Sequence, residues 1–210
     1  MPRRAIIVSH VPPEAFEPDA CRALQNLGYE IVAAGAPSGR AGRPTRGDLR
    51  ILDEASLDQI ADEDSEPVPT IILTREPAPL PANRQVVASL TRPALFQDLY
   101  VALQTALEAT PRSYPRIVTA LPARCTYDDR ACTGVVVSLS EGGCLFRGVD
   151  EPLRERHTSL QFPLPGPGLI SARARHVDQR GSHLGLMFQG LPSSSRAAIS
   201  QYVMDRLVGD

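Results

Sequence analysis

Two arginines, Arg112 and Arg116, lie four positions apart in a segment that reads as a linker. A predicted strand, a turn and a second predicted strand follow, and the second strand ends in the Ser/Gly loop 138–143. The chain contains 22 Arg and no Lys, so every basic side chain carries a planar guanidinium. A guanidinium can make paired hydrogen bonds to a phosphate and can stack on a flat ring. These residues therefore favour recognition of phosphates and flat rings.

The second half of the chain must supply the elements that position these residues, and its apolar pattern changes there from helical to strand-like. Six short strands are predicted, at residues 117–126, 131–139, 144–147, 158–163, 169–177 and 183–188. An amphipathic helix capped by Ser193 to Ser195 follows them. Its apolar face consists of Ile199, Tyr202, Val203 and Leu207. Six strands and one helix indicate a small β-barrel with a helix packed over one end.

This half resembles a PilZ domain, the bacterial receptor module for cyclic di-GMP, across about residues 112–207. The family's first signature, Arg-x-x-x-Arg, is complete as Arg112 and Arg116. Its second signature is Asp/Asn-x-Ser-x-x-Gly. Here Ser138, Ser140 and Gly143 stand at the three defined positions, so that Ser replaces the Asp or Asn.

The resemblance implies a cyclic di-GMP site in which Arg112 and Arg116 clamp the ligand. Ser140 and Gly143 would line the base of that site, and Ser138 would occupy the guanine-contacting position. A Ser hydroxyl is shorter than a carboxylate and uncharged, and loss of a hydrogen bond to a charged group costs on the order of 1.5–3 kcal/mol. Two hypotheses stay open: an effector that binds cyclic di-GMP, and a PilZ scaffold whose two arginines are solvated linker charges.

The first half of the chain alternates predicted strands with predicted helices. The strands are at residues 5–9, 30–35, 49–53, 70–74 and 85–90. One helix is predicted from Pro18 or Asp19 to Gly28, and a second opens at Pro93. Between these elements, residues 36–47 read as a loop, 57–61 as a short helix and the acidic run 62–66 as a solvated loop. The alternation predicts a doubly wound parallel sheet with helices on both sides.

The order of these elements resembles a response-regulator receiver domain over about residues 4–108. At the positions that carry the family's chemistry, this chain has Ser9 and His10, Asp53, Thr74, and Arg92 with Pro93. Phosphoryl transfer to an Asp needs Mg²⁺ held by carboxylate oxygens, which Ser9 and His10 do not supply. We therefore expect a degenerate receiver-like domain that serves protein contacts or dimerisation, with Asp53 as a strand-end or capping residue.

The 210 residues are predicted to form two domains, residues 1–110 and residues 111–210. The first half contains 10 Arg and 15 acidic residues, a net charge of −5. The second contains 12 Arg and 9 acidic residues, a net charge of +3. No apolar run approaches the roughly 18 residues that a membrane helix needs, and the first residues lack the pattern of a signal peptide. We expect a cytoplasmic protein without a membrane partner.

The four cysteines, Cys21, Cys125, Cys132 and Cys144, show no metal-binding spacing, so no metal is predicted. Cys125 and Cys132 could face each other across a hairpin, and reduced core cysteines are the favoured interpretation. The scattered histidines form no catalytic arrangement, so neither catalytic residues nor an enzyme are predicted. A net charge of −2 without an aromatic-rich basic face argues against a nucleic-acid partner. The expected partners are cyclic di-GMP and an unknown protein bound by the N-terminal domain; a homodimer is a further option.

Overall fold

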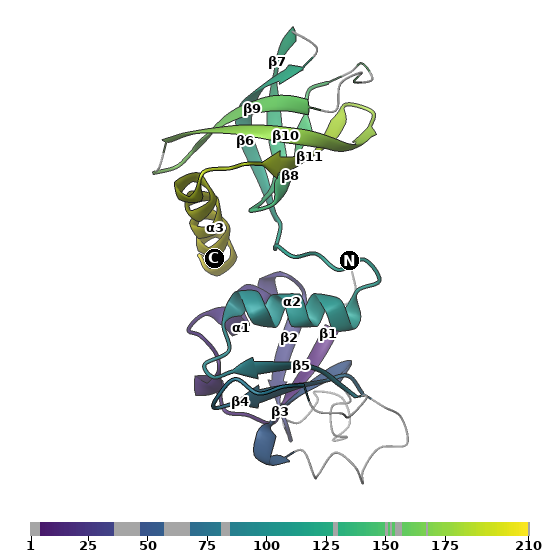
Figure 1. Ribbon diagram of the computed structural model, residues 1–210, viewed down its shortest axis with the longest axis vertical. Helices are drawn as coiled ribbons and strands as arrows, with labels where there is room; N and C mark the ends of the chain where they lie inside the picture. The colour runs from purple at the N-terminus through teal and green to yellow at the C-terminus, as the bar shows by residue number, and fades with distance from the viewer. Residues whose placement is uncertain are drawn as a thin grey trace. The chain divides into compact units, whose positions relative to one another are not determined.

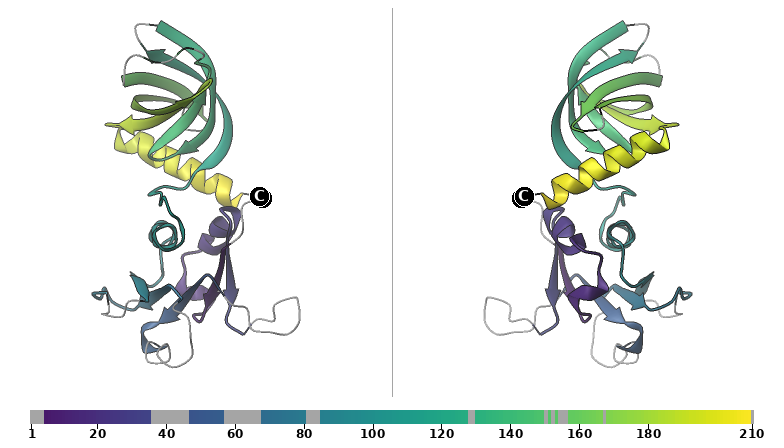
Figure 2. Two further views of the ribbon diagram at one scale, coloured as in Figure 1. Left: turned by 90° about the vertical axis from the view of Figure 1, so that its right-hand side faces the viewer. Right: turned by 90° about the vertical axis from the view of Figure 1, so that its left-hand side faces the viewer.

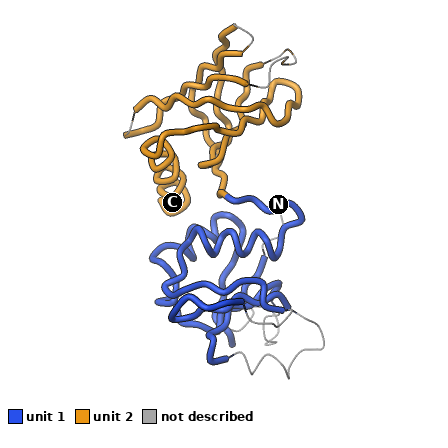
Figure 3. The backbone as a smooth tube through the Cα atoms, in the orientation of Figure 1, with its two compact units in different colours: residues 1–113 blue, residues 114–210 orange. Residues whose placement is uncertain are grey.

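The computed structural model describes residues 5–35, 47–56, 68–80, 85–127, 130–149, 151, 153, 157–166 and 168–209 (Figure 1). The predicted helix at 57–61 and the acidic loop at 62–66 lie outside these residues, as does the loop at 36–47 apart from Gly47. The chain divides into two compact units, Met1–Ser113 and Tyr114–Asp210 (Figure 3). The division into two separately folding domains, residues 1–110 and 111–210, stays a prediction.

The first unit is built on a parallel sheet of five strands. They are β1 (Ala5–Ser9), β2 (Tyr29–Ala33), β3 (Leu49–Asp53), β4 (Thr70–Thr74) and β5 (Val86–Thr91). Their order is β2-β1-β3-β4-β5, one of the two common orders of doubly wound sheets. All five residues of β4 are buried, as expected for an inner strand of a parallel sheet. The predicted parallel sheet with helices is confirmed.

Two described α-helices, α1 (Ala20–Asn26) and α2 (Phe96–Leu107), contact each other in this unit. Helix α2 begins at Phe96, so its predicted start at Pro93 is wrong. Ala94 instead forms a β-bridge with Phe16, and Leu95 has an extended backbone. The Glu17 carboxylate accepts a hydrogen bond of 2.8 Å from the Phe96 N–H, which satisfies one of the free donors at the start of the helix.

The second unit is a closed antiparallel barrel of six strands, as predicted (Figure 2). The strands are β6 (Ile117–Tyr127), β7 (Arg130–Ser140), β8 (Gly143–Arg147), β9 (His157–Leu164), β10 (Gly168–Arg180) and β11 (His183–Gln189). Their order around the barrel is β10-β11-β8-β7-β6-β9. Phe146 and Phe162 are the largest fully buried side chains inside it. Two residues of the predicted hairpin turn, 128 and 129, lie outside the described residues.

Helix α3 (Ser193–Val208) lies along one end of the barrel and contacts β6, β7 and β9 (Figure 2). It buries the predicted apolar face, Ile199, Tyr202, Val203 and Leu207. Pro192 is the residue that precedes the first helical turn, and no side chain caps it. Ser193 to Ser195 therefore lie within the first turn, and their predicted role as a cap is wrong. No helix among the described residues is long and apolar enough to cross a membrane.

Candidate functional site

Ser138 lies on β7 between Val118 of β6 and Leu145 of β8. The register of β7 against β8 shifts between Val136 and Ser138, so Val137 is an extra residue in the strand, a β-bulge. Val136 and Leu139 are both buried, although strict alternation would place residues three apart on opposite faces. The bulge therefore places Ser138 on the outer face, beside Val118, whose side chain is 90% exposed.

The hydroxyl of Ser140 is used within the fold. Ser140 is buried, and its Oγ donates a hydrogen bond of 3.0 Å to the carbonyl oxygen of Gly143. This bond closes the turn between β7 and β8. A second function for the same hydroxyl proton, as a donor to a ligand, would require the turn to give up this bond.

Gly143 is required by a close approach of two strands. It pairs with Met187 of β11, and a Cβ atom at position 143 would overlap with the carbonyl oxygen of Leu186. Its φ is not in the left-handed region, so the need for glycine comes from space and not from backbone conformation. Two of the three defined positions of the loop signature, Ser140 and Gly143, thus have roles in closing the barrel.

Arg116 is an exposed residue immediately before β6. The next residue, Ile117, pairs with Leu139, which places Arg116 at the end of β7 that carries Ser138 and Ser140. Its charge also acts on the buried Cys144 thiol: burial raises the pKa of Cys144, and the nearby Arg116 opposes that rise. Within the second unit the structure thus brings Arg116, Ser138, Ser140 and the Ser/Gly loop to one end of the barrel.

Tyr114, between the two arginines, lies against this loop. A Cβ atom at Gly142 would come within 2.9 Å of the Tyr114 ring, so the ring and the loop backbone are in close contact. The carbonyl oxygen of Gly142 accepts a 3.0 Å hydrogen bond from the Phe188 N–H. Sequence reasoning missed Tyr114, and its place midway between two candidate ligand arginines was the signal that could have found it.

Arg112 belongs to the other compact unit, so the boundary between the units falls between the two arginines. Its side chain is exposed, and its backbone N–H donates a 2.9 Å hydrogen bond to Oε1 of Gln104 on α2. The Gln104 amide in turn donates to the Tyr29 hydroxyl at 2.6 Å, and that hydroxyl donates to Glu108 at 3.2 Å. Burial raises the pKa of Tyr29 to about 12, so its hydroxyl keeps its proton at neutral pH.

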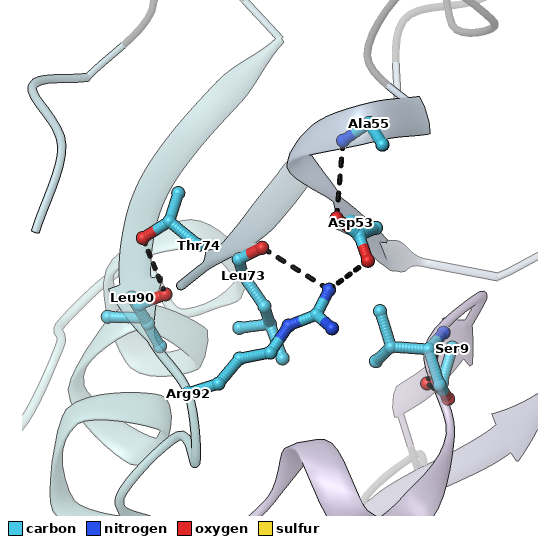
Figure 4. Close-up of polar contacts among 8 residues, drawn as sticks. Ser9, Asp53, Ala55, Leu73, Thr74, Leu90 and Arg92 are labelled. Atoms are coloured by element: carbon cyan, nitrogen blue, oxygen red, sulfur yellow. Dashed lines mark hydrogen bonds and ion pairs between the residues drawn. The ribbon is translucent and has the colours of Figure 1, made fainter. Parts of the chain in front are cut away.

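A second group of polar residues lies at the carboxyl end of the parallel sheet (Figure 4). Asp53, the last residue of β3, forms an ion pair with Arg92, and its Oδ1 accepts a 3.2 Å hydrogen bond from the Ala55 N–H. This confirms Asp53 as a strand-end residue, and its bond to the backbone two residues on is the turn-forming kind typical of Asp. The hydrogen bond from Arg92 lowers the pKa of the Asp53 carboxyl.

The other polar side chains of this edge also bond to nearby backbone. The Thr74 hydroxyl donates to the Leu90 carbonyl at 3.3 Å, and the Ser9 hydroxyl donates to the Val11 carbonyl at 2.9 Å. Arg92 also donates to the Leu73 carbonyl at 3.5 Å (Figure 4). No group of three or more His, Cys, Asp or Glu among the described residues could hold a metal ion. At this edge the Arg92 guanidinium faces the Asp53 carboxylate.

Comparison with protein families gives a match to the family described as PilZ domain, over residues 110–205. These residues are a PilZ domain. The PilZ domain thus includes the arginine pair, the Ser/Gly loop and most of α3. The receiver-like character of the first unit stays a prediction.

Solved structures similar to this chain include three from different bacteria. The Bacillus subtilis inhibitor of motility MotI/DgrA is 16% identical, with a TM-score of 0.43, over 48% of this chain and 53% of that one. The PilZ domain of Escherichia coli YcgR with c-di-GMP is 16% identical, with a TM-score of 0.37, over 47% of this chain and 92% of that one. Borreliella burgdorferi PlzA in complex with c-di-GMP is 18% identical, with a TM-score of 0.36, over 50% and 47%. The chain thus spans about half the length of the MotI chain. Comparison with curated proteins gives no match.

Proposed function

We propose that the PilZ domain binds cyclic di-GMP, and that the first unit relays this signal to a protein partner. The observation that carries the proposal is the PilZ match together with the complete arginine pair, Arg112 and Arg116. Both arginine side chains are exposed, so their guanidinium groups are accessible to a ligand. Each can bind a phosphate through paired hydrogen bonds or stack on a guanine ring. The ligand offers two phosphates and two guanines.

The fold supports a division of roles within the proposed site. Arg112, Arg116 and the outward-facing Ser138 would contact the ligand through their side chains. Ser140 and Gly143, which close the β7–β8 turn, would instead line the site through the shape and the backbone of the loop. The exposed Val118, the register partner of Ser138, offers an apolar surface beside it for a guanine ring.

Calorimetric titration of the full chain with cyclic di-GMP tests the proposal. Arg116→Ala should weaken binding by about 10-fold or more, since a hydrogen bond to a charged group is worth about 1.5–3 kcal/mol. Arg112→Ala should have an effect of the same size. Arg124→Ala is the matched control, because Arg124 is also exposed but lies farther along β6. Absence of binding heat up to high micromolar ligand would contradict the proposal.

The second candidate function is an adaptor that keeps the PilZ fold, does not bind cyclic di-GMP and acts through protein contacts alone. Ser138 at the position of Asp or Asn favours it, because a Ser hydroxyl offers the guanine N–H groups only one weak, uncharged acceptor. Ser138→Asp separates the two functions. If the variant binds cyclic di-GMP and the natural chain does not, the natural protein is the adaptor.

In either case the protein partner is proposed to bind the first unit, and a second copy of the chain is one candidate. The Asp53–Arg92 ion pair favours a role of the first unit in protein contacts over a role in phosphoryl transfer, because Arg92 already neutralises the Asp53 carboxylate. Neither function includes a catalytic step. Sedimentation of the full chain with and without cyclic di-GMP would detect a homodimer and show whether the ligand controls it.

A further inference from the structure

A pair of cysteines lies at the other end of the β6–β7 hairpin from the Ser/Gly loop. Cys125 of β6 and Cys132 of β7 are direct register partners, and both are free thiols. Their side chains are in hydrogen-bond contact. The Thr158 hydroxyl also contacts Cys125, and the Tyr127 hydroxyl contacts Cys132. Four polar side chains thus form one cluster that the proposed ligand site does not use.

The pairing satisfies the geometric requirement for a disulfide. Directly opposed residues of antiparallel strands have Cα atoms about 4.5–5.5 Å apart. A disulfide needs Cα atoms about 4.4–6.8 Å apart, with both Cβ atoms on the same side. Register partners point to the same face of a sheet, and the contact between the two thiols confirms this here. No movement of the strands is therefore needed to bring the sulfur atoms together.

We infer that Cys125 and Cys132 are a site of reversible oxidation, at which a peroxide or a small-molecule disulfide converts the two thiols to an intramolecular disulfide within the barrel wall.

The two thiols differ in access to solvent, and this sets the order of the reaction. Cys125 is fully buried, whereas Cys132 is half-buried near the first residue of β7. Burial raises the pKa of the Cys125 thiol to about 12, so it is protonated at neutral pH and is a poor first nucleophile. Cys132 is therefore the thiol that meets the oxidant, and Cys125 is the resolving thiol.

With hydrogen peroxide the reaction has two steps. The Cys132 thiolate attacks one peroxide oxygen, the O–O bond breaks, and a sulfenic acid and hydroxide form. The hydroxide takes up the proton that Cys132 released and becomes water. The Cys125 sulfur then attacks the Cys132 sulfur as the S–O bond breaks, and the Cys125 proton leaves with the departing hydroxide as a second water. The two sulfur atoms together lose two electrons, which the peroxide accepts.

Mass spectrometry of the full chain, with and without hydrogen peroxide, tests the inference. Trypsin cleaves after Arg124, Arg130 and Arg147, so Cys125 and Cys132 fall on different peptides, 125–130 and 131–147. The oxidised chain should lose about 2 Da, the mass of two hydrogen atoms. The two peptides should become linked, and alkylatable thiols should fall from four to two. Dithiothreitol should restore all four.

Three variants assign the bond. Cys132→Ser should abolish the linked peptide, whereas Cys144→Ala should keep it, although Cys144 lies on the same tryptic peptide as Cys132. Cys21→Ser is the control for a half-buried thiol elsewhere in the chain and should also keep it. A linked peptide that survives Cys132→Ser, or a natural chain in which Cys132 proceeds to sulfinic acid with Cys125 still reduced, would overturn the inference. Peptide mapping of the natural chain decides the question even if a variant does not fold.

Discussion

The Ser/Gly loop of the barrel and the carboxyl end of the parallel sheet both carry polar residues at positions that a known family uses for chemistry. At the sheet, Asp53 is paired with Arg92, and the Ser9 and Thr74 hydroxyls bond to backbone carbonyls. At the loop, the fold uses only some. Ser140 and Gly143 close the turn, whereas Ser138 faces outward.

The difference shows that a residue at a motif position can either stabilise the fold or be available to bind a ligand. A polar side chain whose hydrogen bonds are made within the fold stabilises the protein and has little left for a ligand. A polar side chain on the outer face contributes little to stability and is available for binding. Substitutions at the two places should therefore differ in whether they change the free energy of unfolding or the affinity for a ligand.

The largest expected effect is at Gly143. Gly143→Ala should lower the free energy of unfolding by about 3 kcal/mol, because the added methyl group overlaps with the Leu186 carbonyl and forces β8 and β11 apart. Urea unfolding followed by circular dichroism measures this. Gly142→Ala is the matched control in the same loop. Its methyl group would meet the Tyr114 ring, which can move, so a loss equal to that of Gly143→Ala would show that the loop, and not the strand contact, is the cause.

The Asp53–Arg92 pair should give a smaller effect that depends on pH. Arg92→Ala should cost about 1 kcal/mol at neutral pH, because the pair is partly exposed and screened by solvent. The pKa of Asp53 is lower in the folded state than in the unfolded state, so this contribution is present above the unfolded pKa and is lost as pH falls through the folded one. Stability measured from pH 7 to pH 2 should therefore converge for the variant and the natural chain at acid pH. If the stability difference between the variant and the natural chain stayed the same down to pH 2, an ionised Asp53 would not be the source of the stabilisation.

Ser140→Ala should cost about 1 kcal/mol in unfolding free energy through loss of the bond to the Gly143 carbonyl. Cyclic di-GMP affinity per folded molecule should change less than it does in Arg116→Ala. Thermal unfolding and calorimetry on the same samples provide both values. An unchanged stability with lost binding would assign the hydroxyl to the ligand instead of the turn.

Ser138→Ala should have the smallest effect on stability, within about 0.5 kcal/mol, as for most surface substitutions. The substitution should lower the affinity for cyclic di-GMP, measured by calorimetry, and should leave the thermal unfolding of the chain nearly unchanged. A clear loss of stability would mean that Ser138 has a partner within the fold and would remove the difference between the two loop serines.

The sequence predicts the elements well because their apolar patterns are strong. The alternation in β10 and the continuous apolar run in β4 locate those strands to within a few residues. Two details of the helix starts differ from the prediction. The start of α2 at Phe96 depends on contacts with a distant part of the chain, namely the bridge between Ala94 and Phe16 and the hydrogen bond that the Phe96 N–H donates to Glu17. Helix α3 already begins at Ser193, so Pro192 occupies the capping position and no serine side chain caps the helix.

The residues proposed for the site can be read from the sequence, but their contacts within the fold cannot. The arginine spacing and the Ser/Gly loop are visible in the sequence. The bulge at Val137 is not, because a one-residue register shift leaves no mark on the alternation of an apolar strand that reads Val135-Val-Val137. Without the bulge, Ser138 would be expected inside the barrel. The need for glycine at position 143 likewise depends on Leu186 of β11, which lies more than forty residues later in the chain.

The clash that forbids a side chain at position 143 also affects how related sequences should be compared. Natural selection for folding alone would preserve Gly143, and to a lesser degree Ser140, even in a descendant that had stopped binding any nucleotide. The side chains at positions 112, 116 and 138 are proposed to contact the ligand, so these positions should drift once binding is lost. Homologous sequences should therefore be sorted into receptors and scaffolds by these three positions, while the glycine identifies only the barrel.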